Sequence, residues 1–178
     1  MKSLSLKFAL FLAAFLPPFI LLAQDYNFRF DKITSENIKI EKGLSVNSVN
    51  CILQDNKGFM WFGTWDGLNK FDGYKFIVYK ANEFENNNEL CNQTVRSLLQ
   101  DKEGNIWIGT EGGLNKFEVQ TQKFTQYKRK ITDKSSLSND TVRSIFEDSF
   151  QNLWVGTQNG LNLLNKQTGK FIQFFSNP

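Results

Sequence analysis

Three aspartates recur at a near-constant spacing, and they are the first residues to consider for catalysis: Asp55, Asp101 and Asp148. Two positioned carboxylates are what glycoside hydrolysis requires. Each aspartate is followed three residues later by glycine, or by Gln151 in the third case. Asp and Gly at these positions are typical of a tight turn. We therefore interpret the aspartates as turn residues and expect no catalytic residue and no enzymatic activity in this chain.

Histidine is absent, which excludes Ser-His-Asp and Cys-His catalysis within the chain and removes a common zinc ligand. The two cysteines are Cys51 and Cys91. Cys51 stands where the later repeats have Ser97 and Ser144, so it is interpreted as a small strand residue, and Cys91 is placed in a linker. A disulfide between them stays open but is not favoured. We expect no cofactor and no metal ion.

The composition favours a packed protein without a nucleic-acid partner. Hydrophobic residues make up 40% and aromatic residues 15% of the 178-residue chain, and the formal net charge is +3. No basic stripe is present, so no strong field toward nucleic acid is expected. The run 128–130 is interpreted as a solvated loop.

One stretch occurs three times, with copies 46 and 47 residues apart. The second copy contains Val95–Asp101, then Trp107-Ile108-Gly109-Thr110, then Gly113-Leu114-Asn115. A fixed period of this size indicates a repeat architecture. The recurring structural residues are Trp61, Gly63, Gly67, Trp107, Gly109, Gly113, Trp154, Gly156 and Gly160.

Each copy predicts a four-stranded antiparallel meander. The strands expected in the second copy are Val95–Gln100, Asn105–Thr110, Leu114–Phe117 and Lys123–Tyr127. The last strands of the other copies are expected at Lys75–Tyr79 and Lys170–Phe174, with long polar linkers at 81–92 and 129–140. Four strands per repeat at this period predict an all-β fold of β-propeller blades, here an incomplete propeller of three blades.

Packing explains the recurring residues. Ile106 and Ile108 share one face of their strand, and Trp107 lies on the other with Gly109. The tryptophan supplies a large apolar surface for a neighbouring blade. The glycine after it leaves room for a neighbouring backbone or aromatic ring, and the glycine before leucine sets the turn.

The domain order predicted from the sequence begins with a signal peptide. Residues 1–23 combine Lys2 and Lys7 with an apolar run that ends at Ala23, which is the pattern of a secretory signal peptide. An uncleaved N-terminal anchor is the alternative. The segments that follow are expected to be a lead-in strand at 24–42, blade one at 43–80, linker and blade two at 81–128, and linker and blade three at 129–178.

The pattern of Val, Asp, Gly, Trp-x-Gly-Thr and Gly-Leu-Asn, with Gly43-Leu44-Ser45 before the first copy, resembles the two-component regulator propeller repeat. The third copy departs from it at Gln151 and at Leu164. The resemblance implies the N-terminal sensor region of a periplasmic hybrid histidine kinase that responds to carbohydrate fragments. A membrane span and a kinase would then lie outside this chain, attached to the inner membrane.

Three blades are fewer than a propeller typically has. We therefore expect a fragment of a longer gene product or a partner chain that closes the ring. In a complete propeller, the lead-in strand near Phe28 and Phe30 would pair with the final blade. The two outer blade faces are expected to be apolar and to invite association.

Strand topology brings one set of loops to a common rim, where function is expected. The candidate ligand-binding residues there are Trp65, Asp66, Arg96, Glu111 and Arg143. Trp65 could stack on a sugar ring, although we favour packing on its own loop or linker. For Arg96 and Arg143 we favour hydrogen bonds between blades.

Three functions stay open. The first is a ligand sensor for an oligosaccharide, and it is favoured. The second is a non-catalytic periplasmic protein-interaction module or the remnant of a broken gene. The third, a propeller enzyme, is disfavoured because the recurring aspartates lie in turns on the opposite rim. Contact with the membrane is expected only through the signal peptide or a C-terminal region beyond this chain.

Overall fold

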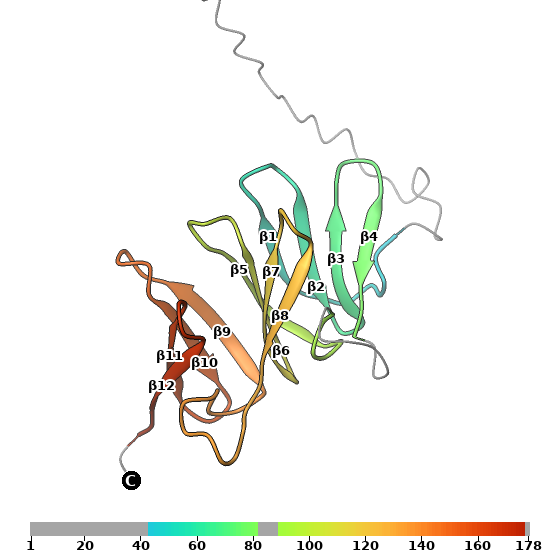
Figure 1. Ribbon diagram of the computed structural model, residues 1–178. Coiled ribbons are helices and arrows are strands. Elements are labelled where there is room, and N and C mark those ends of the chain that lie inside the picture. Colours follow the sequence, from blue (N-terminus) through green and yellow to red (C-terminus); the bar gives the residue numbers. More distant parts are fainter. Residues whose placement is uncertain (1–42, 82–88, 177–178) are drawn as a thin grey trace, which may run out of the picture. The chain divides into compact units, whose positions relative to one another are not determined.

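The computed structural model describes residues 43–81 and 89–176, and within them it contains three four-stranded antiparallel sheets (Figure 1). These residues belong to one compact unit that spans Ser35–Pro178. The predicted signal peptide and lead-in strand, residues 1–42, lie outside the described residues. The prediction of an all-β fold built from four-stranded blades is confirmed.

Each sheet is a meander, because strands that follow one another in sequence are also hydrogen-bonded neighbours. The first sheet consists of β1 (Val49–Gln54), β2 (Met60–Thr64), β3 (Gly67–Phe71) and β4 (Phe76–Tyr79). The second consists of β5 (Val95–Gln100), β6 (Ile106–Thr110), β7 (Gly113–Glu118) and β8 (Lys123–Tyr127). The third consists of β9 (Val142–Glu147), β10 (Leu153–Thr157), β11 (Leu161–Asn165) and β12 (Lys170–Phe174).

The strand ends follow the sequence closely. β5, β8 and β12 have the bounds that the sequence predicts, while β4 and β6 begin one residue later and β7 is one residue longer at each end. The agreement reflects two strong local signals: apolar residues that alternate along each strand, and turns that glycine marks.

The turn between the first two strands of each sheet has one backbone conformation in all three copies. Gly58 and Gly104 have φ of 86° and 85°, and Gln151 keeps this left-handed conformation with φ of 67°. A side chain in this region of backbone space costs roughly 1–2 kcal/mol. The third turn therefore carries a local strain that the first two avoid.

Replacing Gln151 by glycine is expected to raise the free energy of unfolding by about 0.5–1 kcal/mol, because glycine relieves this strain but adds freedom to the unfolded chain. Denaturant unfolding measures the change. The control is Gln158→Gly at an exposed position without positive φ, where glycine is expected to lower stability. A loss of stability in Gln151→Gly would contradict the strain.

An aspartate–tryptophan hydrogen bond, here called the Asp–Trp clamp, closes the same hairpin in every sheet. The indole N–H donates to the aspartate carboxylate at 2.8 Å for Trp61–Asp55, 2.7 Å for Trp107–Asp101 and 3.0 Å for Trp154–Asp148. The same carboxylates accept backbone N–H groups of the turn, as Asp101 does from Asn105 at 2.8 Å. The interpretation as turn residues is confirmed, but their tryptophan partners were not predicted.

These hydrogen bonds make stability sensitive to acid. Burial raises the pKa of Asp148, but hydrogen bonds from Asn152, Trp154 and Phe150 outweigh this effect and lower the pKa to about 2. The folded-state pKa is below the ordinary 3.8. The stabilisation is therefore present above pH 4 and is lost as the pH falls toward 2.

We expect the urea midpoint of the native protein to fall between pH 4 and pH 2, and to fall less in Asp148→Asn, which cannot ionise. Chemical unfolding followed at both pH values tests this. An equal fall in both proteins would contradict a stabilising role for the ionised carboxylate.

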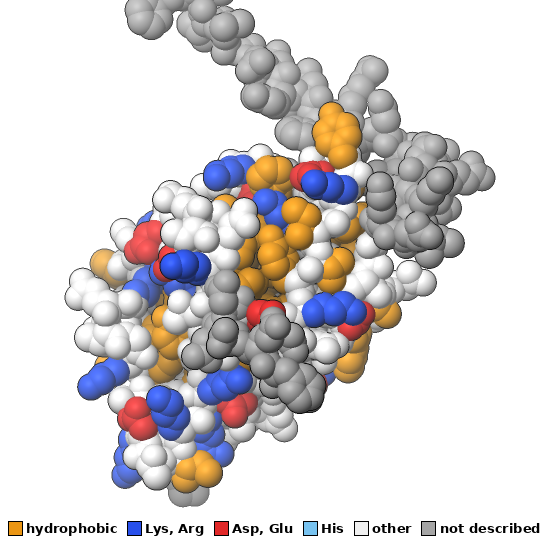
Figure 2. All heavy atoms as spheres, turned by 45° about the vertical axis from the view of Figure 1, so that its right-hand side comes forward, with side chains coloured by type: hydrophobic (Ala, Val, Ile, Leu, Met, Phe, Trp, Pro, Cys, Tyr) orange, Lys and Arg blue, Asp and Glu red, His pale blue; other side chains and the backbone are white. Residues whose placement is uncertain are grey.

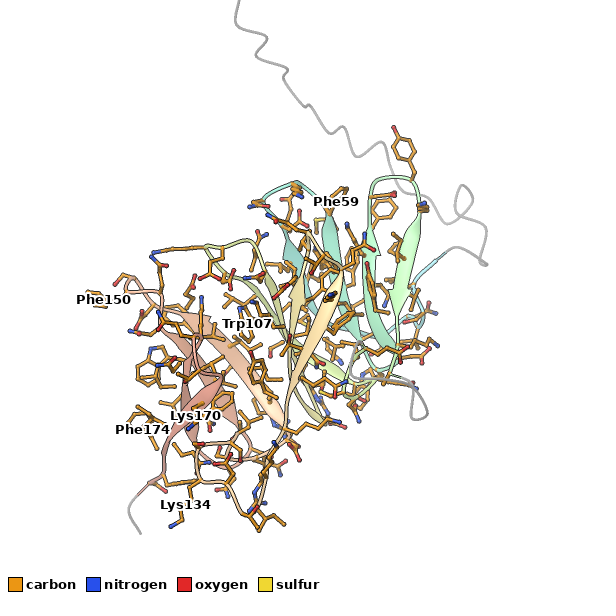
Figure 3. All side chains as sticks on the ribbon, in the orientation of Figure 1. Phe59, Trp107, Lys134, Phe150, Lys170 and Phe174 are labelled. Atoms are coloured by element: carbon orange, nitrogen blue, oxygen red, sulfur yellow. The ribbon has the colours of Figure 1, made fainter. Side chains whose placement is uncertain are left out.

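The sheets pack face to face through the recurring tryptophan and glycine. Trp107 lies between the second and third sheets (Figure 3) and is 1% exposed. On the opposite face, Ile106 and Ile108 join a core with Trp61 of the first sheet. The predicted alternation along β6 is therefore confirmed.

In the first two sheets, the glycine two residues after the tryptophan admits a valine side chain of the next sheet. A Cβ atom added at Gly63 would lie 2.5 Å from Cγ1 of Val95, and one added at Gly109 would lie 2.6 Å from Cγ1 of Val142. We predicted that a backbone segment or an aromatic ring would occupy the space beside this glycine. That prediction was wrong, because the first valine of the following blade fills the space.

The two linkers, which were predicted as long polar segments, each contribute a leucine to the core. Leu90 and Leu137 are 2% and 0% exposed. The residue after each of these leucines, and after the equivalent Leu44 in the first copy, forms hydrogen bonds with a threonine and an asparagine. The three sets are Ser45–Thr64–Asn69, Cys91–Thr110–Asn115 and Ser138–Thr157–Asn162. Cys91 is thus a repeat residue in a serine position.

Both cysteines are free thiols. Cys51 lies in β1, as expected for a small strand residue. Burial raises its pKa from 9.0 to about 11, against a smaller lowering by a backbone hydrogen bond from Gly63. Burial likewise raises the pKa of Cys91. Because the thiolate is the reactive form, both thiols are protected in the folded protein.

Cys51 is expected to make stability fall as the pH rises from 9 toward 11, because only the unfolded thiol ionises in this window. Urea unfolding at pH 8 and pH 10 measures this fall. Cys51→Ser, which installs the residue of the other two repeats, is expected to lose less stability over the same interval. An identical loss in both proteins would show that Cys51 does not contribute.

Candidate functional site

The loop between β2 and β3 carries Trp65 and is held in shape by Thr64. The Thr64 hydroxyl donates to the carbonyl of Gly67 at 2.8 Å and accepts the backbone N–H of Asp66 at 3.1 Å. Gly67 has φ of 111°, which glycine adopts readily. Its N–H donates to the carbonyl of Gln93 at 2.8 Å, so the loop is tied to the segment that leads into β5.

Trp65, Arg96 and Glu111 lie together at one rim, and we call them the Trp65 cluster. The guanidinium carbon of Arg96 lies 4.7 Å from the centre of the Trp65 ring, a cation–π contact between the first and second sheets. Arg96 Nε donates to Glu111 Oε1 at 3.1 Å, and its Nη2 contacts the same oxygen. Trp65 is 50% exposed.

These contacts bear on two of the sequence predictions for this rim, and they correct one of them. Trp65 contacts Arg96 of the following blade, and its packing on its own loop or linker stays a prediction. The hydrogen bonds of Arg96 stay within its own blade, at Glu111, and its contact between blades is with the ring. The sequence contained a signal for these contacts. The two partners of Arg96, Trp65 and Glu111, occupy the same position in successive repeats, one before Arg96 in the sequence and one after it.

The other two candidates are not part of the cluster. Asp66 forms an ion pair with Lys80 at 2.7 Å, across the end of its own sheet. Arg143 has no hydrogen bond or ion pair with the described residues and is exposed on β9. At the equivalent position of β1, Asn50 Nδ2 donates to the carbonyl of Val95 at 2.9 Å, which is the bond between blades expected of the arginines.

A polar cleft lies at the opposite ends of the strands. Its volume is about 270 Å³, and its lining includes Asn56, Glu103, Asn105, Lys116 and Glu118. Lys116 and Glu118 already pair at 3.1 Å. The described lining contains no aromatic side chain, so the Trp65 cluster is the better surface for stacking on a ligand.

Charge does not gather on the face shown in Figure 2, where lysine and arginine side chains are dispersed among acidic ones. Among the described residues, no group of three or more cysteines, aspartates or glutamates is arranged to hold a metal ion. The part of the chain that the structure describes also contains no helix long and apolar enough to span a membrane.

Comparison with known families assigns the repeats. Residues 43–66, 89–112 and 136–159 match the family model described as two component regulator propeller. Three segments of the chain, 72 of its 178 residues, thus match this repeat. Each match begins before the first strand of its blade and includes Leu44, Leu90 or Leu137, in agreement with the burial of the latter two in the core.

Two of the similar proteins are named as signalling proteins. A protein named histidine kinase P4 from Formosa agariphila is 48% identical over 62 residues, which are 35% of this chain and 4% of that protein. The solved extracellular domain of a hybrid two-component system from B. thetaiotaomicron is 36% identical, with a TM-score of 0.72, over 78% of this chain and 20% of that one. The chain thus spans a small part of each relative.

More distant structures share the fold alone. Virginiamycin B lyase from Staphylococcus aureus matches with a TM-score of 0.57 at 12% identity, over 78% of this chain and 47% of the lyase. PorZ from Porphyromonas gingivalis, a component of the type IX secretion system, matches with a TM-score of 0.54 at 17% identity, over 71% of this chain and 21% of PorZ. These likenesses support the propeller blade as the structural unit.

Proposed function

We propose that the chain forms part of the periplasmic sensor propeller of a two-component signalling protein and binds an oligosaccharide at the Trp65 cluster. The three matched repeats and the two signalling relatives support the sensor role. In such a protein the phosphotransfer chemistry would lie in other domains. This chain would contribute the recognition surface.

The observation that carries the ligand proposal is the half-exposed ring of Trp65, held on a tied loop and backed by Arg96. A flat aromatic ring offers an apolar face to the C–H face of a sugar. Arg96 and Glu111 supply hydrogen-bond donors and acceptors beside it. Because the cluster is already ordered by its own contacts, little entropy is lost when a ligand binds.

Isothermal titration calorimetry with defined oligosaccharides from plant and algal polysaccharides tests this proposal. For the oligosaccharide that binds, Trp65→Ala is expected to weaken the affinity at least tenfold, about 1.4 kcal/mol. The matched control is Tyr74→Ala, which removes a 92% exposed aromatic ring from the opposite rim of the same blade. Equal affinities for native protein and Trp65→Ala would overturn the site.

Export is tested separately. The signal-peptide pattern of residues 1–23 predicts an exported chain that begins at Gln24, and we propose that this chain is periplasmic. Cell fractionation and N-terminal sequencing measure both points. A chain that stays in the cytoplasm with Met1 intact would contradict periplasmic sensing without bearing on the fold.

A further inference from the structure

A pocket lies where the second sheet, the linker that follows it and the third sheet meet, and we call it the lysine pocket. Its volume is about 270 Å³. It is bordered by the end of β8, by the linker and by β12, which begins at Lys170 (Figure 3). The lining includes Tyr127, Lys128, Lys130, Asp133, Lys170 and Phe171. The pocket thus lies between two packed sheets and not on an outer face.

Hydrogen bonds hold the walls of the lysine pocket in place. The backbone N–H of Phe171 donates to the carbonyl of Ser135 at 2.7 Å, and Gln173 Nε2 donates to the carbonyl of Ser136 at 2.8 Å. The linker is therefore attached to β12. Within the linker, the Ser136 hydroxyl accepts the backbone N–H of Lys130 at 2.9 Å. Because these walls are already ordered, a ligand loses little affinity to ordering the protein.

The lining of this pocket has an excess of positive charge. Lys128, Lys130 and Lys170 form no ion pair with any residue in the described ranges 43–81 and 89–176. The one acidic side chain of the lining, Asp133, accepts the hydroxyl of Ser135 at 2.7 Å and its backbone N–H at 2.9 Å. These hydrogen bonds lower the pKa of Asp133, so it carries a negative charge at neutral pH. Three positive charges thus stand against one negative charge.

A pocket of the same construction lies between the first and second sheets. Its volume is about 290 Å³. Gln126 Nε2 donates to the carbonyl of Glu89 at 2.8 Å, at the repeat positions of Gln173 and Ser136. Its described lining is Val78, Tyr79, Lys80, Glu89, Gln122 and Phe124. One fold therefore builds two pockets of similar size, and their charges can be compared directly.

The pocket between the first two sheets has acidic side chains that the lysine pocket lacks. Lys80, the counterpart of Lys128, pairs with Asp66 at 2.7 Å. The position of Asp66 is occupied by Gly112 in the next blade, so Lys128 lacks this partner. The carboxylate of Glu89 likewise has the hydroxyl of Ser136 in its place. The positive charge of the lysine pocket is thus specific to it and does not follow from the repeat.

We propose that the lysine pocket binds an acidic sugar unit, whose carboxylate or sulfate ester pairs with the lysine ammonium groups. Such charge-assisted hydrogen bonds are stronger than neutral ones. The rings of Tyr127 and Phe171, with centroids 5.8 Å apart, add apolar surface to the lining. The pocket volume lies near the lower end of the range for small-molecule sites, about 300–1,000 Å³, which suits a single sugar unit. This proposal goes beyond the proposed function, because it names a second site and an anionic ligand.

Isothermal titration calorimetry at low ionic strength, with trigalacturonate and with galactose 6-sulfate, tests the site on the purified chain. Lys128→Gln, Lys130→Gln and Lys170→Gln are each expected to weaken binding about threefold, and the triple variant roughly 30-fold, as for exposed ion pairs. The matched control is Lys123→Gln, which removes the same charge at the repeat position of Lys170 in the second sheet, outside the pocket. It is expected to keep the native affinity.

Two further ligands separate the acidic sugar from simpler explanations. Methyl-esterified trigalacturonate, which lacks the negative charges, is expected not to bind at this site. Inorganic sulfate is expected to bind more weakly than the sugars, because it cannot use the aromatic rings. Binding of neither acidic sugar, equal affinities for the native protein and the triple variant, or sulfate binding as tight as that of the sugars would overturn the proposal. Trp65→Ala is expected to leave binding in the lysine pocket unchanged, so the two sites fail or succeed separately.

Discussion

Replacing Asp101 by alanine is expected to lower the free energy of unfolding by about 3–5 kcal/mol, because it leaves buried partners without their acceptor. The Asp101 carboxylate has no exposed area and accepts the indole N–H of Trp107 at 2.7 Å. The ammonium of Lys166 lies 3.5 Å away and also contacts Glu147. The substitution thus removes the centre of a cluster that joins the second and third sheets.

The electrostatics of the site agree with this expectation. Burial raises the pKa of Asp101, but hydrogen bonds from Trp107 and Asn105 and the charge of Lys166 together lower it. The ionised form is therefore stabilised in the folded protein.

Chemical denaturation of Asp101→Ala and Asp148→Ala measures the effect. The second substitution removes the same clamp from the third sheet, where Trp154 is only partly buried, so it is expected to cost less. Equal losses in the two variants would contradict the dependence on burial. A stable Asp101→Ala protein would show that the clamp is not needed to hold the second sheet.

Replacing Gly109 by alanine is expected to cost about 3 kcal/mol, the upper part of the usual range for overpacking. The added Cβ would lie 2.6 Å from Cγ1 of Val142 and would also collide with the hydroxyl of Ser97. Val142 is fully buried between the second and third sheets, so it cannot move aside without separating them.

Gly156→Ala is the matched control, measured by urea unfolding of dilute protein. The three atoms nearest to its added Cβ all belong to Ser144, whose exposed hydroxyl can rotate away. We expect a loss below about 1 kcal/mol there. If Gly109→Ala proved as mild as Gly156→Ala, the close approach of Val142 to Gly109 would not be a determinant of blade packing.

Much of the fold could be predicted because its signals are local. The alternation of β6 places Trp107 and Ile108 on opposite faces, and glycine marks the turns. The clamp was missed because Asp101 lies in the turn after β5 and Trp107 lies six residues later on β6, and only the folded hairpin brings them together. The role of Cys91 was also missed, although Leu90-Cys91 repeats Leu44-Ser45 at the same spacing as the tryptophans.

The candidate site was predicted less completely than the fold. Strand topology correctly placed Trp65, Arg96 and Glu111 at one rim, because strand direction fixes on which side each loop lies. Which side chains touch depends on side-chain reach and competing charges. Asp66 has Lys80 within 2.7 Å and pairs with it, while Arg143 has no acidic partner among the described residues.

The most direct test of the proposed function is the ¹H–¹⁵N spectrum of the four indole N–H groups during titration with a bound oligosaccharide. Three of these groups belong to the Asp–Trp clamps, and Trp65 is the fourth. We predict that the Trp65 resonance shifts in step with binding while the clamp resonances stay in place. Binding that leaves the Trp65 resonance unmoved would place the ligand elsewhere and contradict the proposed site.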